Sequence, residues 1–275
     1  MLVAMAARSR RALSLWLAAA IVAAAALPAS DAAADPKARD RKYRVAAIGA
    51  AILLFVASET VAKDALSPDR CRWCTPGNFD DGARELAVWA DPDRAARLSN
   101  LIGYGLAPIA ASGLLLAASA RTRAGWWTAY GDDMIAMFEI VWGVQLVTQA
   151  VKITAARERP YANYGADVDE RAQEQNLSFF SGHSSLTFSL AVGSGIIAER
   201  RGSRLAPVIW ASGLAIAATT GYLRMAADRH YATDVLTGAA AGALGAVLIP
   251  RLTGSLSSRA TLVPQPGGLA LVGRF

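Results

Sequence analysis

Long apolar runs separated by short polar segments dominate the chain from residue 45 onward. Runs of this length suit helices that cross a bilayer, which need about 20 mainly apolar residues. Small residues such as Gly238 and Gly242 permit close helix contact, and in a polytopic bundle such a pair marks packing within one chain more often than dimerisation. The pattern predicts an all-α, polytopic transmembrane helix bundle with five or six spans. The predicted helices cover residues 45–62, 98–120, 134–151, 186–198, 205–223 and 235–252.

The first 34 residues follow a different pattern. Three arginines precede an alanine-rich apolar run over residues 12–27, and small residues follow it. This arrangement is typical of a secretory signal, and we expect cleavage near Ala32 or Ala34, with a retained signal anchor as the alternative. We expect the rest of the chain to divide into an N-terminal helix with an external loop (35–97), a core helix bundle (98–252) and a tail (253–275).

Composition and charge support a membrane protein. Hydrophobic residues make up 54% of the 275 residues and the formal net charge is +6. The basic residues cluster in short loops between apolar runs, as they do where lysine and arginine set membrane orientation. A basic helix or a basic stripe interleaved with aromatic residues would indicate nucleic acid, and the sequence has neither. We therefore expect a membrane as a partner, and no nucleic acid.

The loop charges also predict which side the polar clusters occupy. Arginines near residues 121–123, 200–204 and 251 mark cytoplasmic loops by the positive-inside tendency. The opposite, external side then carries residues 63–97, 153–182 and 224–230. One element conflicts with this assignment, because a cleaved signal followed by a spanning helix at 45–62 would reverse every later loop. Either the N-terminal segment is not used as a signal, or the helix at 45–62 does not cross.

Both cysteines, Cys71 and Cys74, fall in one external segment. A zinc site would need more ligands, and the sequence places no other cysteine or histidine nearby. A local disulfide in an oxidising compartment is the favoured interpretation, and a redox-active pair is the alternative.

Three polar clusters interrupt the apolar pattern and carry candidate chemistry. In the first, Lys152 and Arg159 are seven residues apart, so on one helix they share a face with Gln145. Cations near a helix end can also snorkel to the interface or complement the helix dipole. Taken with the other clusters, we expect the two cations to bind an anion at the end of this helix.

The second cluster is Ser181-Gly182-His183, directly before an apolar helix. A serine or glycine at a helix start leaves backbone N–H groups free, and with the positive helix end these form an anion cradle. His183 would lie in the first turn, within reach of a bound phosphate ester. An N-cap serine with an incidental histidine is the alternative.

The third cluster joins Arg224, His230 and Asp234. The last two stand one helical turn apart, so the carboxylate can accept the imidazole N–H and fix its tautomer. The other ring nitrogen is then available as a nucleophile or base. Arg224 offers a planar fork suited to phosphate oxygens. An ordinary histidine–aspartate helix pair is the alternative.

The order of the clusters, Lys-x6-Arg-Pro, then Ser-Gly-His, then Arg-x5-His-x3-Asp, resembles the type 2 phosphatidic acid phosphatase (PAP2) superfamily. That superfamily also includes vanadium-dependent haloperoxidases and soluble bacterial acid phosphatases. The resemblance covers roughly residues 98–252. Two positions depart from the family pattern: Phe180 stands where the second motif usually has proline, and Leu223 stands where the third usually has serine.

The resemblance implies a role for each cluster residue. His230 attacks phosphorus and forms a phosphohistidine, Asp234 holds His230, and His183 protonates the leaving oxygen and later activates water. The implied phosphate ligands are Lys152, Arg159, Ser181, Gly182 and Arg224. Fixed cations and backbone N–H groups can stabilise the charge of a transferring phosphoryl group, so no metal or other cofactor is expected.

The resulting hypothesis is a membrane phosphatase that hydrolyses a lipid phosphate monoester or pyrophosphate on the outer face of a bacterial-type inner membrane. Phosphatidate, phosphatidylglycerol phosphate and a polyprenyl diphosphate are all compatible substrates. One alternative keeps the fold but binds vanadate for halide oxidation, or acts as a non-specific acid phosphatase. Another is a non-catalytic lipid-binding or transport bundle.

Overall fold

The computed structural model describes residues 36–120, 125–165, 174–255, 260–265 and 268–273. The expected signal segment 1–34 and the loop at Arg121 and Arg123 lie outside these residues.

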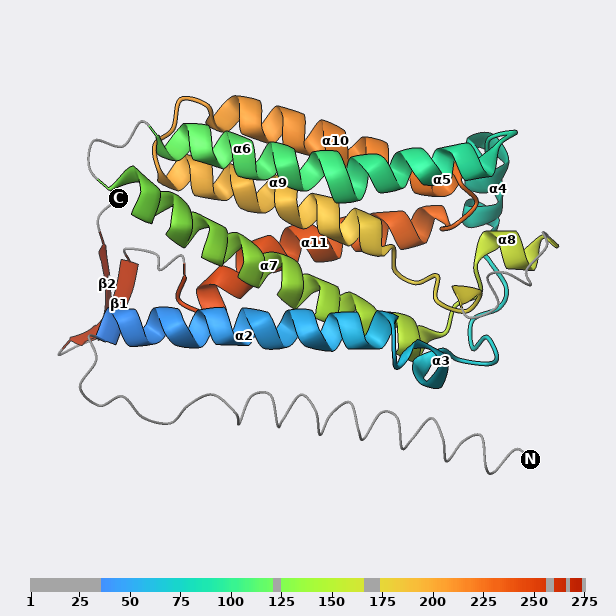
Figure 1. The fold of residues 1–275 in the computed structure, drawn as a ribbon, viewed down its shortest axis with the longest axis horizontal. Coiled ribbons are helices and arrows are strands. Elements are labelled where there is room, and N and C mark those ends of the chain that lie inside the picture. Colours follow the sequence, from blue (N-terminus) through green and yellow to red (C-terminus); the bar gives the residue numbers. More distant parts are fainter. Residues whose placement is uncertain (1–35, 121–124, 166–173, 256–259, 266–267, 274–275) are drawn as a thin grey trace.

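Long helices packed lengthwise make up the described part of the chain (Figure 1). Helices α2, α7 and α10 run in one direction, and α6, α9 and α11 run in the other. The all-helical bundle predicted from the apolar runs is confirmed. The long helices are α2 (Pro36–Glu59), α5 (Pro92–Asn100) continued by a π-helical turn (Leu101–Leu106) and α6 (Ala107–Ser119), α7 (Trp126–Ala155), α9 (Gly182–Arg200), α10 (Ala206–Ala226) and α11 (Ala232–Leu252).

Short elements gather at one end of this bundle. They are α3 (Lys63–Leu66), α4 (Asn78–Ala87) and α8 (Pro160–Asn163). The turns from α7 to α9 and from α10 to α11 lie at the same end, which we call the site end. The opposite end holds the turn from α9 to α10, with Arg200 and Arg204, and the last turn of α11, with Arg251; we call it the arginine end.

The helices extend beyond the apolar runs because polar residues form their first and last turns. The helix predicted from residue 98 begins at Pro92, where Asp91 caps it by accepting a 2.9 Å hydrogen bond from the Arg94 N–H. Proline suits this first position because its missing N–H has no partner there in any helix. Apolar periodicity alone therefore underestimates helix length at the polar ends.

Helix α9 is the centre of the bundle and packs against α6, α7, α10 and α11. Its contact with α11 depends on two glycines. A Cβ at Gly238 would lie 2.6 Å from the Ser181 carbonyl oxygen, and one at Gly242 would lie 2.4 Å from that of Ser185. These small residues therefore bring two helices of one chain together, as expected for a polytopic bundle.

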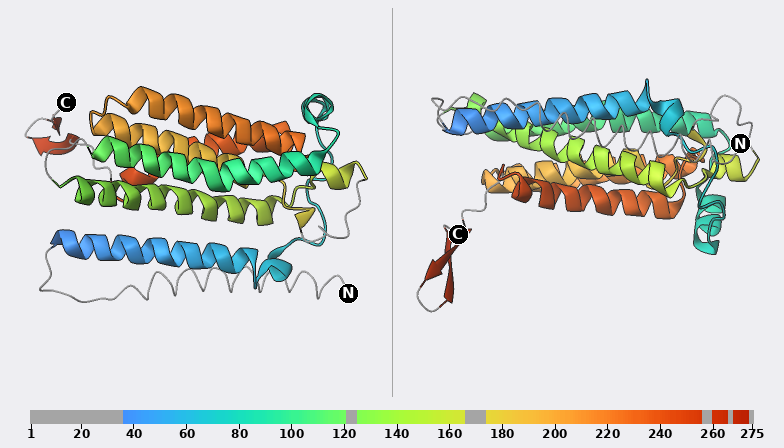
Figure 2. Two further views of the ribbon diagram at one scale, coloured as in Figure 1. Left: turned by 45° about the horizontal axis from the view of Figure 1, so that its top comes forward. Right: turned by 90° about the horizontal axis from the view of Figure 1, so that it is seen from below.

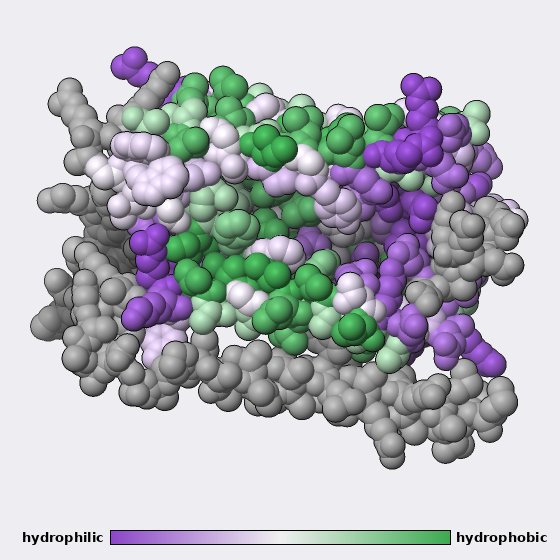
Figure 3. All heavy atoms as spheres, in the orientation of Figure 1, coloured by the Kyte–Doolittle hydropathy of each residue, from purple (hydrophilic) through white to green (hydrophobic). Residues whose placement is uncertain are grey.

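Four of the described helices are long and apolar enough to cross a membrane: Pro92–Ser119, Trp126–Ala155, Ala206–Ala226 and Ala232–Leu252. Hydrophobic side chains cover the middle of the face shown in Figure 3, and hydrophilic ones gather toward its ends. Helix α9 lies among these spans, so most of its side chains face protein rather than lipid. This location explains why α9 tolerates a serine-rich sequence.

Helix α2 lies lengthwise against α7 and is joined to it by an ion pair between Arg44 and Glu139. The Arg44 Nε atom is 2.7 Å from the Glu139 carboxylate, and both side chains are largely buried. Phe55 packs edge-on against Trp142 further along the same contact. Helix α2 begins at the arginine end and finishes at the site end, so it runs parallel to α7.

Two short strands follow the last helix. Strands β1 (Ala260–Gln265) and β2 (Gly268–Gly273) pair antiparallel, with Ala260 opposite Gly273. The hairpin projects away from the helices (Figure 2). The sequence assigns residues 253–275 to a tail, and its pattern does not predict that two strands pair within this tail.

Candidate active site

A cavity of about 860 Å³ lies between α2, α6, α7 and α9 and reaches the site end. Six of the predicted site residues line it: Lys152, Arg159, Gly182, His183, Arg224 and His230. The other two, Ser181 and Asp234, are completely buried directly behind its wall. The structure thus brings together three clusters that are up to 82 residues apart, counted from Lys152 to Asp234.

Lys152 lies at the end of α7 and faces the start of α9. Its Nζ atom is 3.4 Å from the point where a Cβ at Gly182 would lie. One and two turns earlier, Thr148 and Gln145 contact the Ser185 hydroxyl at 3.0 and 3.3 Å. These hydrogen bonds fix α7 against the first turn of α9, so the ammonium group and the N-terminal backbone of α9 share one anion site.

The prediction that Arg159 continues the polar face of α7 is wrong. Helix α7 ends at Ala155, and Arg159 has extended backbone angles as the N-cap of α8. The left-handed backbone of Ala156 ends α7, and Pro160 then favours the extended conformation of Arg159. Arg159 reaches the cavity from this loop, and its guanidinium donates 2.9 and 3.0 Å hydrogen bonds to the backbone carbonyls of Glu174 and Arg229.

Arg224 enters the same cavity from the last turn of α10. Its Nη1 atom donates a 3.1 Å hydrogen bond to the Ser99 hydroxyl. Its Nε atom is buried and has no hydrogen-bond partner among the described residues. Buried polar groups are normally hydrogen-bonded, so an unpaired nitrogen on an arginine that lines the cavity indicates a site for an anionic ligand.

His183 lies in the first turn of α9 and is held by the α5–α6 helix. Its Nε2 atom is 2.8 Å from the Asn100 Oδ1 atom, and its Nδ1 atom is 3.5 Å from the Tyr104 hydroxyl. Tyr104 lies within the π-helical turn, a rare conformation that is frequent at functional sites. The amide oxygen can only accept, so Nε2 carries a proton in this arrangement.

His230 lies in the turn before α11 rather than on the helix, which corrects the expected spacing of one helical turn within a single helix. Asp234 is the third residue of α11 and accepts a 3.0 Å hydrogen bond from the Tyr231 N–H, completing a capping box. The same Oδ2 atom is 3.6 Å from the His230 Nδ1 atom. The carboxylate therefore faces the expected ring nitrogen, at a distance longer than a hydrogen bond.

The electrostatics of the site favour a neutral His230 imidazole and a charged Glu174 carboxylate. Burial, reinforced by the positive charges of Arg159 and Arg224, holds the pKa of His230 well below its usual range. Burial raises the pKa of Glu174, but Arg159 and Lys63 outweigh it and lower that pKa to about 2. A neutral imidazole has a free lone pair, which a nucleophile or general base requires.

Several residues of the site were missed by the sequence analysis. Asn100 and Tyr104 fall at the start of a predicted apolar run, where a polar amide in an otherwise hydrophobic stretch was the available signal. Glu59, Glu174 and Arg229 also line the cavity. These last three lie in or beside loops, and nothing in their local spacing relates them to the three clusters.

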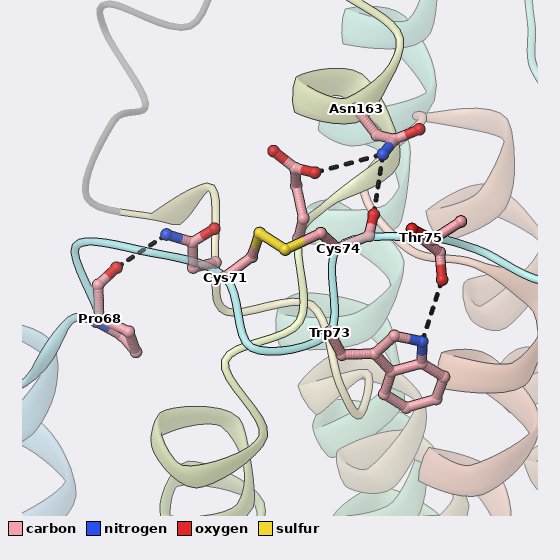
Figure 4. The surroundings of a disulfide bond; sticks show 8 residues. Pro68, Cys71, Trp73, Cys74, Thr75 and Asn163 are labelled. Atoms are coloured by element: carbon pink, nitrogen blue, oxygen red, sulfur yellow. Dashed lines mark hydrogen bonds between the residues drawn. A yellow bond between two sulfur atoms is a disulfide. The ribbon is translucent and has the colours of Figure 1, made fainter.

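Cys71 and Cys74 are joined by a disulfide bond, with Cα atoms 5.3 Å apart. The bond closes a tight loop beside the segment that connects α7 to α8 (Figure 4). The Cys74 carbonyl accepts a 2.9 Å hydrogen bond from the Asn163 amide, which ties this loop to α8. The pair lies at the site end but does not line the cavity.

The geometry supports transfer of a phosphoryl group. Three cations and the backbone N–H groups at the start of α9 can hold an anion whose negative charge is spread over several oxygens. One neutral imidazole, His230, lies 3.5 Å through its Nε2 atom from the Arg159 guanidinium, so the atom that could attack points toward the anion site. A second, protonated imidazole nitrogen on His183 lies in the same cavity.

A family model described as the PAP2 superfamily matches residues 134–257. The chain is also similar to the crystal structure of the first transmembrane PAP2 type phosphatidylglycerolphosphate phosphatase from Bacillus subtilis. That similarity has a TM-score of 0.49 and 18% identity, over 76% of this chain and 97% of that one. No curated protein matches the chain. The residues that match the PAP2 superfamily model, 134–257, contain all three clusters.

Proposed function

We propose that this chain is a membrane phosphatase that hydrolyses a lipid phosphate monoester or pyrophosphate through a phosphohistidine on His230. The main observation behind this proposal is that one cavity combines the anion site with a long apolar extension. Along α7 the cavity is lined from Lys152 to Met134, which spans about 27 Å at 1.5 Å per residue. Such a cavity fits a molecule with a phosphate at one end and hydrocarbon at the other.

The apolar extension is formed by four helices. Its walls include Phe55 on α2, Ile109 on α6, Phe138 on α7 and Leu190 on α9. Figure 3 shows this face of the molecule hollowed between α6 and α2. A soluble phosphate ester would gain nothing from this part of the cavity, whereas each buried methylene of a lipid tail contributes about 0.8 kcal/mol.

In the proposed reaction, the cations bind the phosphate and His230 Nε2 attacks phosphorus in line with the leaving oxygen. Asp234, facing Nδ1, stabilises the positive charge that develops on the ring. His183, as an imidazolium, gives one proton to the leaving oxygen, and the neutral imidazole that remains then removes one from the attacking water. Lys152, Arg159 and Arg224 stabilise the charge that spreads over the equatorial oxygens of the phosphoryl group.

The test is phosphate release by purified protein in detergent, measured with alkyl phosphates of increasing chain length and with glycerol 3-phosphate. We expect kcat/KM to rise about fourfold per methylene, from about 0.8 kcal/mol each, and to level off when the cavity is full. Ala111→Phe places a ring in the apolar wall, so the rise should stop at a shorter chain.

Ala117→Phe is the matched control, because Ala117 is exposed on α6 and does not line the cavity. Equal activity on glycerol 3-phosphate and on long-chain phosphates would contradict a lipid substrate while leaving phosphatase chemistry intact. Bromination that depends on added vanadate, without phosphate release, would instead support the haloperoxidase alternative.

We also propose that the site end faces the periplasm and the arginine end faces the cytoplasm. Arg200, Arg204 and Arg251 lie at the arginine end, as does the basic start of α2. This orientation follows the positive-inside tendency. If α2 crosses with the bundle, its first residue is cytoplasmic, so the segment before it does not act as an export signal.

This orientation predicts that residues 1–34 are retained in the purified protein. Intact mass spectrometry of membrane-extracted protein should give the full-length chain, at about 28.8 kDa. A mass that corresponds to a chain starting near Ala32 or Ala34 would contradict the orientation of α2 and restore the cleaved signal.

A further inference from the structure

Arg157, in the loop between α7 and α8, is the most deeply buried arginine among the described residues, with 1% of its surface exposed. It does not line the cavity and has no place in the three clusters. Lysine, arginine and aspartate are almost never fully buried unless they are paired. Its partners show what this arginine does.

The Arg157 guanidinium bridges two buried carboxylates from different elements. Its Nη2 atom is 2.6 Å from Asp80 Oδ2 on α4, and its Nη1 atom is 2.6 Å from Asp234 Oδ1 on α11. Thr233 closes the arrangement, because its backbone N–H and its hydroxyl donate to Asp80 at 2.9 and 2.7 Å. Helix α4 is thereby fastened to the first turn of α11.

Two aromatic rings enclose the same guanidinium. Its Cζ atom is 3.9 Å from the centre of the Trp73 ring and 4.3 Å from that of Tyr231. Trp73 belongs to the disulfide loop, and its ring points away from the sulfur atoms (Figure 4). Main-chain hydrogen bonds from Arg72 to Ala156 and from Glu158 to Trp73, at 2.9 and 3.1 Å, hold this loop beside Arg157.

These contacts determine how Asp234 is oriented. One carboxylate oxygen, Oδ1, is held by Arg157. The other, Oδ2, accepts hydrogen bonds from the Ser178 hydroxyl at 2.5 Å and from the Tyr231 N–H at 3.0 Å, and it faces His230 Nδ1 at 3.6 Å. Because the carboxylate is planar, fixing Oδ1 fixes the direction in which Oδ2 faces the imidazole.

We propose that the segment from Trp73 to Asp80 is a positioning element that acts through Arg157 to hold Asp234 against His230. This inference rests on the proposed function, since it assigns these residues to the step in which His230 attacks. Trp73 and Asp80 both lie outside residues 134–257, so the element is added to the matched core from elsewhere in the chain. Arg157 is a positioning residue and touches no substrate.

The experiment compares variants that keep every charge near the site. His230 is faced by Lys152 on α7, Arg159 before α8, Arg224 on α10, His183 on α9 and Asp234 on α11. Trp73→Ala and Arg157→Lys alter none of these, and Arg157→Lys also keeps the positive charge while losing the planar fork that bridges two carboxylates. Trp73 is 40% exposed, so its replacement disturbs folding less than a core substitution.

We expect kcat per folded molecule to fall about 10- to 100-fold in Arg157→Lys, by analogy with the replacement of groups that orient a metal-bound histidine, with KM within about twofold. The loss of kcat should be smaller in Trp73→Ala, and Trp73→Phe, which keeps an aromatic ring, should retain most of the activity. In a plot of kcat/KM against pH, the acidic limb should move to lower pH in Arg157→Lys and Trp73→Ala. The reason is that a displaced Asp234 stabilises the His230 imidazolium less.

Arg201→Lys is the control, because Arg201 makes a similar forked contact with the buried Asp133 at the arginine end. It should lower thermal stability without changing kcat or the acidic limb. Unchanged kcat and limb in Arg157→Lys and Trp73→Ala, or an equal loss in Arg201→Lys, would overturn the positioning inference. Retained activity in His230→Ala would overturn the proposed function itself, so the two failures are distinguishable.

Discussion

Replacing His230 with alanine should lower kcat by at least ~10⁴-fold, because it removes the atom that forms the covalent bond to phosphorus. The side chain is 3% exposed, and its Nδ1 atom makes no hydrogen bond within the described residues, so the loss of folding energy should be modest by comparison. Phosphate release and acid-labile labelling with a ³²P-phosphate ester measure the two consequences separately. Both should vanish.

His183→Ala is the matched comparison, because it removes the other imidazole of the same cavity. With p-nitrophenyl phosphate the leaving group needs no proton, so the first step should proceed and labelled enzyme should accumulate. For His183→Ala we expect a burst of p-nitrophenol followed by slow turnover. Labelled protein in His230→Ala, or its absence in the wild type, would contradict the phosphohistidine.

Lys152→Ala should produce the next largest loss, about 10²- to 10³-fold in kcat, which corresponds to about 3–4 kcal/mol. The ammonium faces the start of α9, where the oxygens of the transferred phosphoryl group would lie. Its electrostatic attraction for these oxygens grows as negative charge develops on them in the transition state. Steady-state kinetics with one alkyl phosphate measures this loss. Orthovanadate, a mimic of the transition state, should lose inhibition by a similar factor.

Lys42→Ala is the control for lysine removal, because Lys42 lies near the start of α2 at the arginine end. It should leave kcat, KM and vanadate inhibition unchanged. A rise in KM with constant kcat in Lys152→Ala would mean that the lysine binds substrate and transition state equally, which contradicts its assigned part in the chemical step.

The fold was largely predictable because membrane helices carry their signal in uninterrupted apolar length. Runs at 205–223 and 235–252 correspond closely to α10 and α11. Helix α9 was predicted shorter, from residue 186, because its first turn consists of the polar residues that form the site. The end of α7 was missed for the converse reason: the sequence from Ala155 to Arg159 continues a helical polar face, and only the left-handed Ala156 breaks it.

The candidate site was predictable where its residues form short clusters, and not where they act across the fold. His183 and His230 were identified from neighbours within a few positions. Asp80 could not be, because its partners Arg157 and Thr233 lie 77 and 153 residues away. A lone aspartate in an external loop has no periodicity or spacing that distinguishes it from a solvated charge, so its burial is information that only the fold contains.

The contact between Arg44 and Glu139 has a consequence for how the chain is assembled during synthesis. Glu139 lies well within the apolar length of α7, and an isolated carboxylate there is costly to insert into hydrocarbon. Helix α2 emerges from the ribosome first and carries the guanidinium that neutralises it. Pairing with α2 therefore offsets part of the cost of placing Glu139 in hydrocarbon, which favours joint insertion of the two helices.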